Sequence, residues 1–220
     1  MDLSFLCQDV SAKQVSFSKG EYIIHQGDQL THVYYISQGI CERIEYAEDG
    51  NEILFSTKTS TKGLEALVGL NNLWNPSPYS ISSFRAITNL TCWQIDAANA
   101  KKHLSASTSI LNAIVAMQAK NYISLRRLFK SHHERRVPSL VCHFLLDHAK
   151  ADKGNWLVPK NYTNAAIGRH LGVHPVTISR VLTFLRKRSI LTRTEKGLYI
   201  INRQKLETYA NDKKMPYKET

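Results

Sequence analysis

The sequence predicts an α+β chain in which an N-terminal antiparallel β-barrel or jelly roll is followed by a long helix and a small basic domain. Three observations carry this prediction. Short β-branched and aromatic runs recur every 8 to 12 residues as far as Ile95, with glycine-bearing turns between them. From Ala98 to about His132 the chain has neither proline nor glycine, and helix formers dominate. The excess of basic residues is confined to the part that follows.

The composition is that of a chain with a packed core. Of its 220 residues 43% are hydrophobic, and no run of eighteen apolar residues occurs. The N-terminus lacks the basic start and apolar centre of a signal peptide. The four cysteines are widely spaced without a CxxC pair, which favours a reducing compartment over disulfides or a zinc site. We therefore expect a cytoplasmic protein with no membrane association, no metal and no other cofactor.

The charge is distributed unevenly along the chain. Residues 130–220 hold 18 of the 29 Lys and Arg residues but only 7 of the 18 Asp and Glu residues. Residues 1–129 are therefore neutral, and the C-terminal part carries the whole net charge of +11. A polyanion bound by that part alone is the simplest physical reading.

The barrel strands are placed by their turns. The predicted strands cover residues 17–24, 33–36, 41–46, 52–57 and 81–95. The third and fourth strands flank Glu48-Asp49-Gly50-Asn51, whose Asp-Gly step is a strong hairpin signal. A long polar loop with two prolines, residues 71–78, precedes the last segment.

The long helix predicts a dimer. Ile114, Asn121 and Leu128 recur at heptad spacing on one stripe. A long helix with a narrow apolar stripe buries it against its own barrel or against a second copy. We favour a homodimer seam in which Asn121 specifies pairing and register. The alternative is a helix packed only on its own barrel, with Asn121 exposed.

The basic part contains a helix-turn-helix pattern. Helices are predicted over residues 163–171 and 174–188, and the second buries an apolar stripe. Gly168, Gly172 and Ile178 stand at offsets of four and six residues. They provide a small residue where two helices cross, a turn residue tolerant of positive φ and an apolar plug. Such a motif presents its second helix to the major groove of DNA.

A short hairpin completes the motif. Residues 190–193 and 198–201 flank a turn that ends at Gly197, so the domain reads as a winged helix. Arg180 is expected to reach a guanine edge or a phosphate, with Val176 against a thymine methyl. The predicted DNA-binding residues are Thr163, His174, Val176, Thr177, Ser179, Arg180 and Arg186.

These residues resemble the CRP/FNR superfamily of bacterial transcription regulators over nearly the whole chain. The barrel motifs that carry the resemblance are Phe17-x-Lys19-Gly20-x-x-Ile23, Gly27-Asp28, Val33-Tyr34-Tyr35-Ile36 and Gly39. The later motifs are Ile167-Gly168-x-x-Leu171-Gly172-Val173 and Thr177-Ile178-Ser179-Arg180-Val181-Leu182. Residues 172–182 look most like the branch of halorespiration regulators.

The resemblance implies a functional division of the chain. Residues 1–103 would form an effector-sensing barrel similar to a cyclic nucleotide-binding domain. Residues 104–136 would form the dimerisation helix and a hinge before Pro138, and residues 137–220 the winged helix-turn-helix. The resemblance also implies a homodimer on double-stranded DNA, an effector between barrel and helix, and contact with RNA polymerase.

Departures from the family patterns limit which effector the barrel is expected to bind. Members that bind cyclic AMP have a Gly-Glu pair and, about ten residues later, an Arg-Ser or Arg-Thr that holds the phosphate. Glu65 matches the glutamate, but Ser80 and Ile81 stand where the second pair belongs. Cys7 alone cannot hold the iron-sulfur cluster of the FNR branch. We therefore expect an effector other than cyclic AMP. Its predicted contacts are Glu65, Tyr79, Ser80, Phe84, Tyr122 and Arg126.

The favoured function is an effector-controlled DNA-binding regulator with no enzymatic activity. The alternative is a ligand-binding barrel protein or a cupin-like enzyme without a DNA role. A cupin metal site needs a tight His-x-His with a further Glu and His. His25 and His32 are isolated, so the pattern disfavours that alternative.

Overall fold

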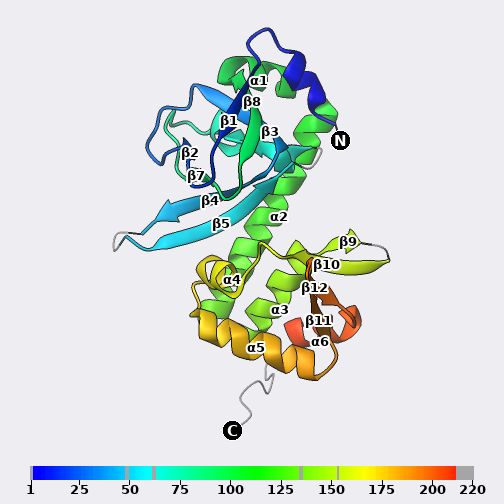
Figure 1. The fold of residues 1–220 in the computed structure, drawn as a ribbon. Coiled ribbons are helices and arrows are strands. Elements are labelled where there is room, and N and C mark those ends of the chain that lie inside the picture. Colours follow the sequence, from blue (N-terminus) through cyan, green and yellow to red (C-terminus); the bar gives the residue numbers. More distant parts are fainter. Residues whose placement is uncertain (1, 48–49, 61–62, 134–135, 153, 212–220) are drawn as a thin grey trace. The chain divides into compact units, whose positions relative to one another are not determined.

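The computed structural model describes residues 2–47, 50–60, 63–133, 136–152 and 154–211 (Figure 1). The chain divides into two compact units, Met1–Ala119 and Lys120–Thr220, each with its own apolar core. The boundary falls inside the long helix, whereas the predicted boundaries gave that helix a segment of its own. Residues from its first half pack into the first core, and Leu128 packs against the second.

The first unit contains two antiparallel four-stranded sheets, of order β1-β8-β3-β6 and β2-β7-β4-β5. Its strands are β1 (Lys13–Phe17), β2 (Tyr22–Ile24), β3 (His32–Gln38), β4 (Ile40–Tyr46), β5 (Glu52–Thr59), β6 (Leu67–Val68), β7 (Ser83–Ala86) and β8 (Leu90–Asp96). Short 3-10 helices are η1 (Ser4–Gln8), η2 (Leu64–Ala66) and η3 (Leu70–Trp74). The predicted antiparallel barrel is confirmed, although residues 17–24 divide between β1 and β2.

The helical region is two helices, not one. The unbroken helix expected from Ala98 is α1 (Ala97–Ser105) followed by α2 (Thr108–His133). Asp96 caps α1 by accepting a hydrogen bond from the Asn99 N–H at 3.0 Å. The Ser107 hydroxyl likewise accepts the Ile110 N–H at 3.4 Å. A serine hydroxyl that captures a backbone N–H starts a new helix, which explains the break.

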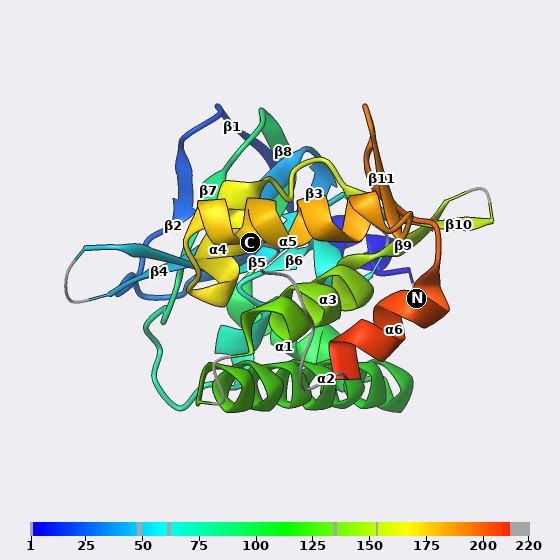
Figure 2. The same cartoon turned by 90° about the horizontal axis from the view of Figure 1, so that it is seen from below.

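The second unit is a winged helix-turn-helix, as predicted (Figure 2). Its elements are α3 (Val137–His148), β9 (Lys150–Asp152), β10 (Asn155–Pro159), α4 (Asn164–Leu171), α5 (Pro175–Lys187), β11 (Leu191–Thr194), β12 (Gly197–Ile200) and α6 (Arg203–Asn211). The sheet order is β11-β12-β10-β9. The sequence analysis did not anticipate α6, which lies beside α3, where the Ser139 hydroxyl donates to the Ala210 carbonyl. None of the helices within these ranges combines the length and apolarity needed to cross a membrane.

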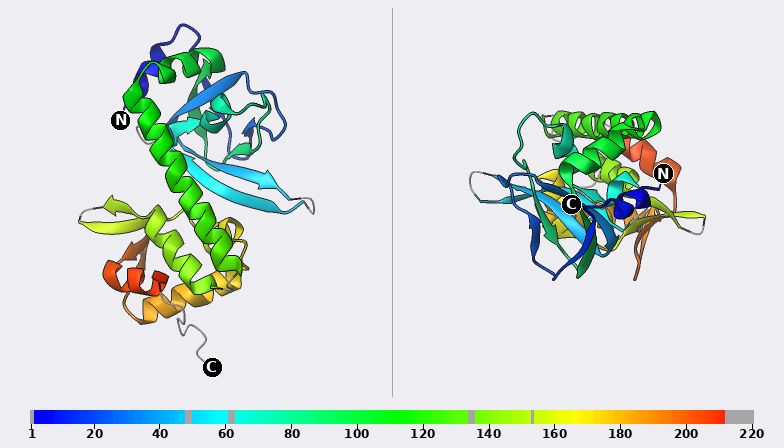
Figure 3. Two further views of the ribbon diagram at one scale, coloured as in Figure 1. Left: turned by 180° about the vertical axis from the view of Figure 1, so that it is seen from behind. Right: turned by 90° about the horizontal axis from the view of Figure 1, so that it is seen from above.

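The faces of α2 differ from the predicted seam. The helix runs unbroken over its whole length (Figure 3). Ile114 is buried in the core of the first unit, and Leu128 is partly buried against the core of the second. Asn121, between them on the stripe, is exposed. Ile114 and Leu128 thus pack within their own units, and the seam predicted through them stays a prediction.

A different stripe of α2 is open to solvent. Val115, Tyr122 and Phe129 are 66%, 61% and 77% exposed. They follow one another at intervals of seven residues, so they share one face of the helix. Apolar side chains of this size at such exposure mark a surface that binds another apolar surface.

Candidate DNA-binding surface and effector site

The two helices of the helix-turn-helix begin at side-chain caps. The Thr163 hydroxyl accepts a hydrogen bond from the Ala166 N–H at 3.1 Å. The His174 ring accepts one from the Val176 N–H through Nδ1 at 3.3 Å. Both capping residues are exposed, and each satisfies an N–H that the helix itself leaves without a partner. These two predicted DNA-binding residues therefore also act as helix N-caps.

The turn between the helices depends on two glycines. Gly172 ends α4 in the left-handed region, with φ of 62°. A Cβ built on Gly168 would lie 2.5 Å from the Val173 carbonyl oxygen, closer than real Cβ atoms come. Ile178, the predicted plug, is fully buried. The predicted roles of all three residues are confirmed, and together they determine the direction of α5.

The faces of α5 separate packing from recognition. The buried residues are Ile178, Val181, Leu182, Phe184 and Leu185. Val176, Arg180 and Arg186 are exposed, while Thr177 and Ser179 are partly buried beside them. Side chains four residues apart lie on one helix face, which places Val176 and Arg180 together. The five predicted contacts on this helix thus form or border its open surface.

Arg180 is available to a partner. Among the described residues its guanidinium makes no hydrogen bond and no salt bridge. Arg186, in contrast, donates to the Thr183 hydroxyl at 3.0 Å. Lys187, and Arg193 on the wing, are further exposed cations that the sequence analysis did not single out. The clustering of Lys and Arg around a helix-turn-helix could have added both residues to the predicted DNA-binding set.

The predicted effector contacts do not all lie in one environment. Glu65 is exposed, and Tyr79 is 54% exposed. Phe84 is buried in the barrel core, so its role there is packing. Tyr122 and Arg126 belong to the second unit, and the Arg126 guanidinium carbon lies 5.8 Å from the centroid of the Tyr122 ring.

Ser80, which the sequence analysis placed where cyclic AMP binders have an arginine, both accepts and donates a hydrogen bond through its hydroxyl. Its side chain accepts from Asn72 Nδ2 at 2.9 Å and donates to the Ser82 carbonyl at 2.7 Å. The residue is only 3% exposed. A neutral, satisfied hydroxyl at this position supplies no charge for a cyclic phosphate.

Arg85, the nearest arginine along the strand, is held on the opposite face. It pairs with Glu52 at 2.6 and 2.8 Å and with Glu42 at 3.4 Å. Its neighbour Phe84 points into the core, and strand side chains alternate between faces. Arg85 therefore points away from the core face on which Phe84 lies.

Arg43 and Lys58 were missed by the sequence analysis. Both are partly buried on neighbouring strands, β4 and β5. The Arg43 Nε donates to the Ser82 hydroxyl at 2.8 Å. The available signals were the spacing of Arg43 from Cys41 on β4 and of Lys58 from Leu54 on β5, since alternate residues of a half-buried strand face the core.

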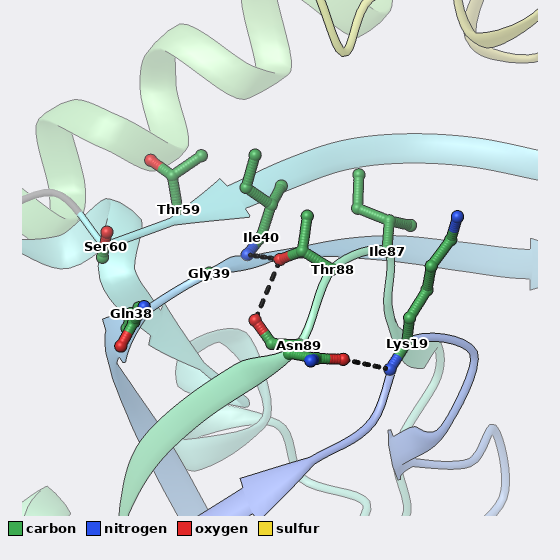
Figure 4. Close-up of a pocket in the computed structure, with 9 residues that line it drawn as sticks. All are labelled: Lys19, Gln38, Gly39, Ile40, Thr59, Ser60, Ile87, Thr88 and Asn89. Atoms are coloured by element: carbon green, nitrogen blue, oxygen red, sulfur yellow. Dashed lines mark hydrogen bonds between the residues drawn. The ribbon is translucent and has the colours of Figure 1, made fainter.

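A shallow surface hollow of about 730 Å³ lies at the edge of the barrel (Figure 4). Its lining residues are Lys19, Gln38, Gly39, Ile40, Thr59, Ser60, Ile87, Thr88 and Asn89. Thr88 accepts the Ile40 N–H at 2.9 Å, and Asn89 accepts the Lys19 N–H at 3.2 Å. None of the predicted effector contacts lines it. Elsewhere in the described ranges, no three His, Cys, Asp or Glu side chains are grouped as metal ligands.

Comparison with known proteins assigns both units. Residues 14–107 match the cyclic nucleotide-binding domain, and residues 141–209 match the Crp-like helix-turn-helix domain. A probable transcriptional regulator, flp, of Lacticaseibacillus casei is 24% identical over 203 residues, covering 92% of this chain and 89% of the relative.

Solved structures share the fold. FixK2 from Bradyrhizobium japonicum has a TM-score of 0.69 at 20% identity, covering 91% of this chain and 98% of its own. A CprK variant complexed with OCPA has a TM-score of 0.65 at 18% identity, covering 94% of this chain and 92% of its own. At these identities the likeness concerns the fold alone, so placement in the halorespiration branch stays a prediction.

A cyclic nucleotide-binding domain joined to a helix-turn-helix domain defines a class of DNA-binding regulators. Within that class, the chain belongs to the CRP/FNR family of transcription regulators. Regulators of this family bind DNA and act as dimers.

Proposed function

We propose that this regulator is a homodimer that binds an inverted-repeat operator through α5, under the control of a small effector other than cyclic AMP. The observation that carries the DNA part is the exposed guanidinium of Arg180, which has no partner among the described side chains. An arginine on a recognition helix forms its strongest specific contact with a guanine edge. Val176 beside it favours a thymine methyl, so A/T-rich half-sites are expected.

The exposed stripe of Val115, Tyr122 and Phe129 supports the dimer. Two copies of α2 that pair through these residues would bury large apolar side chains at heptad spacing. A symmetric dimer presents two recognition helices, and its operator then has half-sites centred about one helical turn apart.

The Ser80 network supports an effector other than cyclic AMP. A phosphate taken out of water without a cation is heavily penalised. Ser80 has no charge, and its one donor hydrogen is already used on the Ser82 carbonyl. By family resemblance we also propose contact with RNA polymerase, action in the bacterial cytoplasm where the DNA lies, and no catalytic activity.

Selection of operator sequences from random DNA by the full chain, at stated salt, tests the proposal. The expected result is an inverted repeat with A/T-rich half-sites. Unpaired, direct or G/C-rich sites would contradict it. Calorimetry with cyclic AMP is expected to detect no micromolar binding, and such binding would overturn the effector part.

A further inference from the structure

We propose that the first unit binds an anionic group of its effector between Arg43 and Lys58, and that the effector is a small carboxylate with an apolar body. This inference rests on the proposed effector control and names the ligand class of that site. It assigns the charge contact to the β4–β5 hairpin instead of the Ser80 position.

The strand register places both cations on the core side of the hairpin. Arg43 pairs across strands with Phe84, and Cys41 pairs with both Lys58 and Ala86. Residues directly opposite each other in antiparallel strands share a face. Because Phe84, Cys41 and Ala86 belong to the barrel core, Arg43 and Lys58 are directed to the same side.

Of these two cations, only Arg43 forms a salt bridge among the described residues. The Arg43 guanidinium lies 3.5 Å from the Glu45 carboxylate and is otherwise bonded to the Ser82 hydroxyl. Within the described part of the first unit, the Lys58 ammonium makes no hydrogen bond and no salt bridge. Glu45 is committed to Arg43. Glu65 acts on Lys58 without forming a salt bridge to it, so the Lys58 ammonium has no direct anionic contact from the described residues and can receive one from a ligand.

The surroundings make an added anion favourable. Burial lowers the pKa of Lys58 to about 8, and the nearby Arg43 lowers it too, whereas Cys41 and Glu65 act in the opposite direction. Burial raises the pKa of the Cys41 thiol to about 12, so that group is neutral near pH 7. A bound carboxylate would supply the missing countercharge and favour the protonated amine.

An aromatic side chain borders Arg43. The Phe55 ring centroid lies 5.3 Å from the Arg43 guanidinium carbon, and Phe55 is 36% exposed. An anion beside a partly exposed aromatic ring fits a carboxylate that carries an apolar group, such as an aromatic or short aliphatic acid.

Calorimetry on the full chain at pH 7 tests this inference. The probes are matched acids and neutral amides: benzoate and benzamide, phenylacetate and phenylacetamide, hexanoate and hexanamide. At least one acid is expected to bind about tenfold or more tightly than its amide. Arg43→Gln and Lys58→Met should each remove that preference. Arg85→Gln, a cation removed from the opposite face of the same sheet, should keep it.

The pH dependence separates a charge contact from a packing effect. Lys58 is protonated below its pKa of about 8, so affinity for the acid should fall as the pH rises from 7 to 9. Lys58→Arg stays charged over this range and should keep its affinity.

Three results would overturn the inference: no binding by any acid at millimolar concentration, equal affinity for acid and amide, or unchanged preference in both variants. Gel shifts with the same proteins keep the tests separate. Failure of the proposed function would appear as loss of operator binding by the wild-type chain. Failure of this inference would leave operator binding intact.

Discussion

Arg43 and Arg85 of the first unit are used differently from Arg180 of the second. In the first unit, Arg43 and Arg85 both lie within 3.5 Å of a carboxylate. In the second, Arg180 on α5 has no carboxylate partner among the described residues. Cations that are paired inside a barrel stabilise its strands or contribute to a small-ligand site. Exposed cations without a carboxylate partner on a helix suit the binding of a polyanion. The net charge of a unit therefore indicates its binding partner only when one also knows which of its cations are already paired with carboxylates.

Arg85 illustrates the structural use. The Arg85 guanidinium donates two hydrogen bonds to the Glu52 carboxylate. These hydrogen bonds are the largest cause of the raised pKa of Arg85. The pair joins β7 to β5 across β4 and lies 23% and 25% exposed. Such a cation is committed to the fold and is not available to DNA.

The largest expected effect concerns the surface that would join two copies. Tyr122→Asp with Phe129→Asp should convert the dimer to monomers, since four carboxylates would then face one another in an apolar seam. Operator affinity should fall by about 10²- to 10⁴-fold because each monomer holds one half-site. Light scattering and gel shifts measure the two effects.

A matched control tests the location of the seam. Lys120→Asp with Asn121→Asp adds two acids at exposed positions away from the stripe, and the dimer should persist. If the control pair dissociated the dimer and the first pair did not, the seam would lie on the originally predicted stripe.

A smaller effect should be confined to the second unit. Gly168→Ala places a Cβ 2.5 Å from the Val173 carbonyl oxygen, so the turn must shift. We expect a loss of about 1–3 kcal/mol in the free energy of unfolding of this unit. Amide hydrogen exchange of the second unit at increasing denaturant concentration measures it. Ala165→Ser, at an exposed position of the same helix, should change stability by less than about 0.5 kcal/mol.

The comparison of arginines can be tested directly. Arg180→Ala should weaken specific operator binding by about 1–3 kcal/mol, because a charged bidentate contact is lost. Arg85→Ala should leave operator affinity unchanged and lower the thermal stability of the first unit. Gel shifts with specific and random DNA are the measurement. An equal loss on both DNAs would show that Arg180 contacts a phosphate.

The smallest effect is electrostatic. Lys187→Ala removes an exposed cation near the end of α5 and should reduce the slope of log affinity against log salt by about 1. Lys101→Ala, an exposed lysine of the first unit, should leave the slope unchanged. Equal slopes for wild type and Lys187→Ala would place Lys187 outside the DNA contact.

Local signals predicted much of the second unit. Gly168, Gly172 and Ile178 predicted the crossing, the turn and the plug because each role depends on a residue's size or allowed φ. The break before α2 was missed because a serine cap weighs little in a long helical pattern. The cluster around Arg43 was missed because it joins residues from separate strands.

The sequence by itself determined the strand and helix order, the helix-turn-helix and the confinement of positive charge to the C-terminal part. Those properties depend on neighbours within a few residues, or on composition. Only the tertiary structure decided which stripe of α2 is open, since Ile114 and Val115 are adjacent apolar residues and packing alone distinguishes them. It also decided that Arg85 is paired and Arg180 is open, because a cation's partners come from distant parts of the chain.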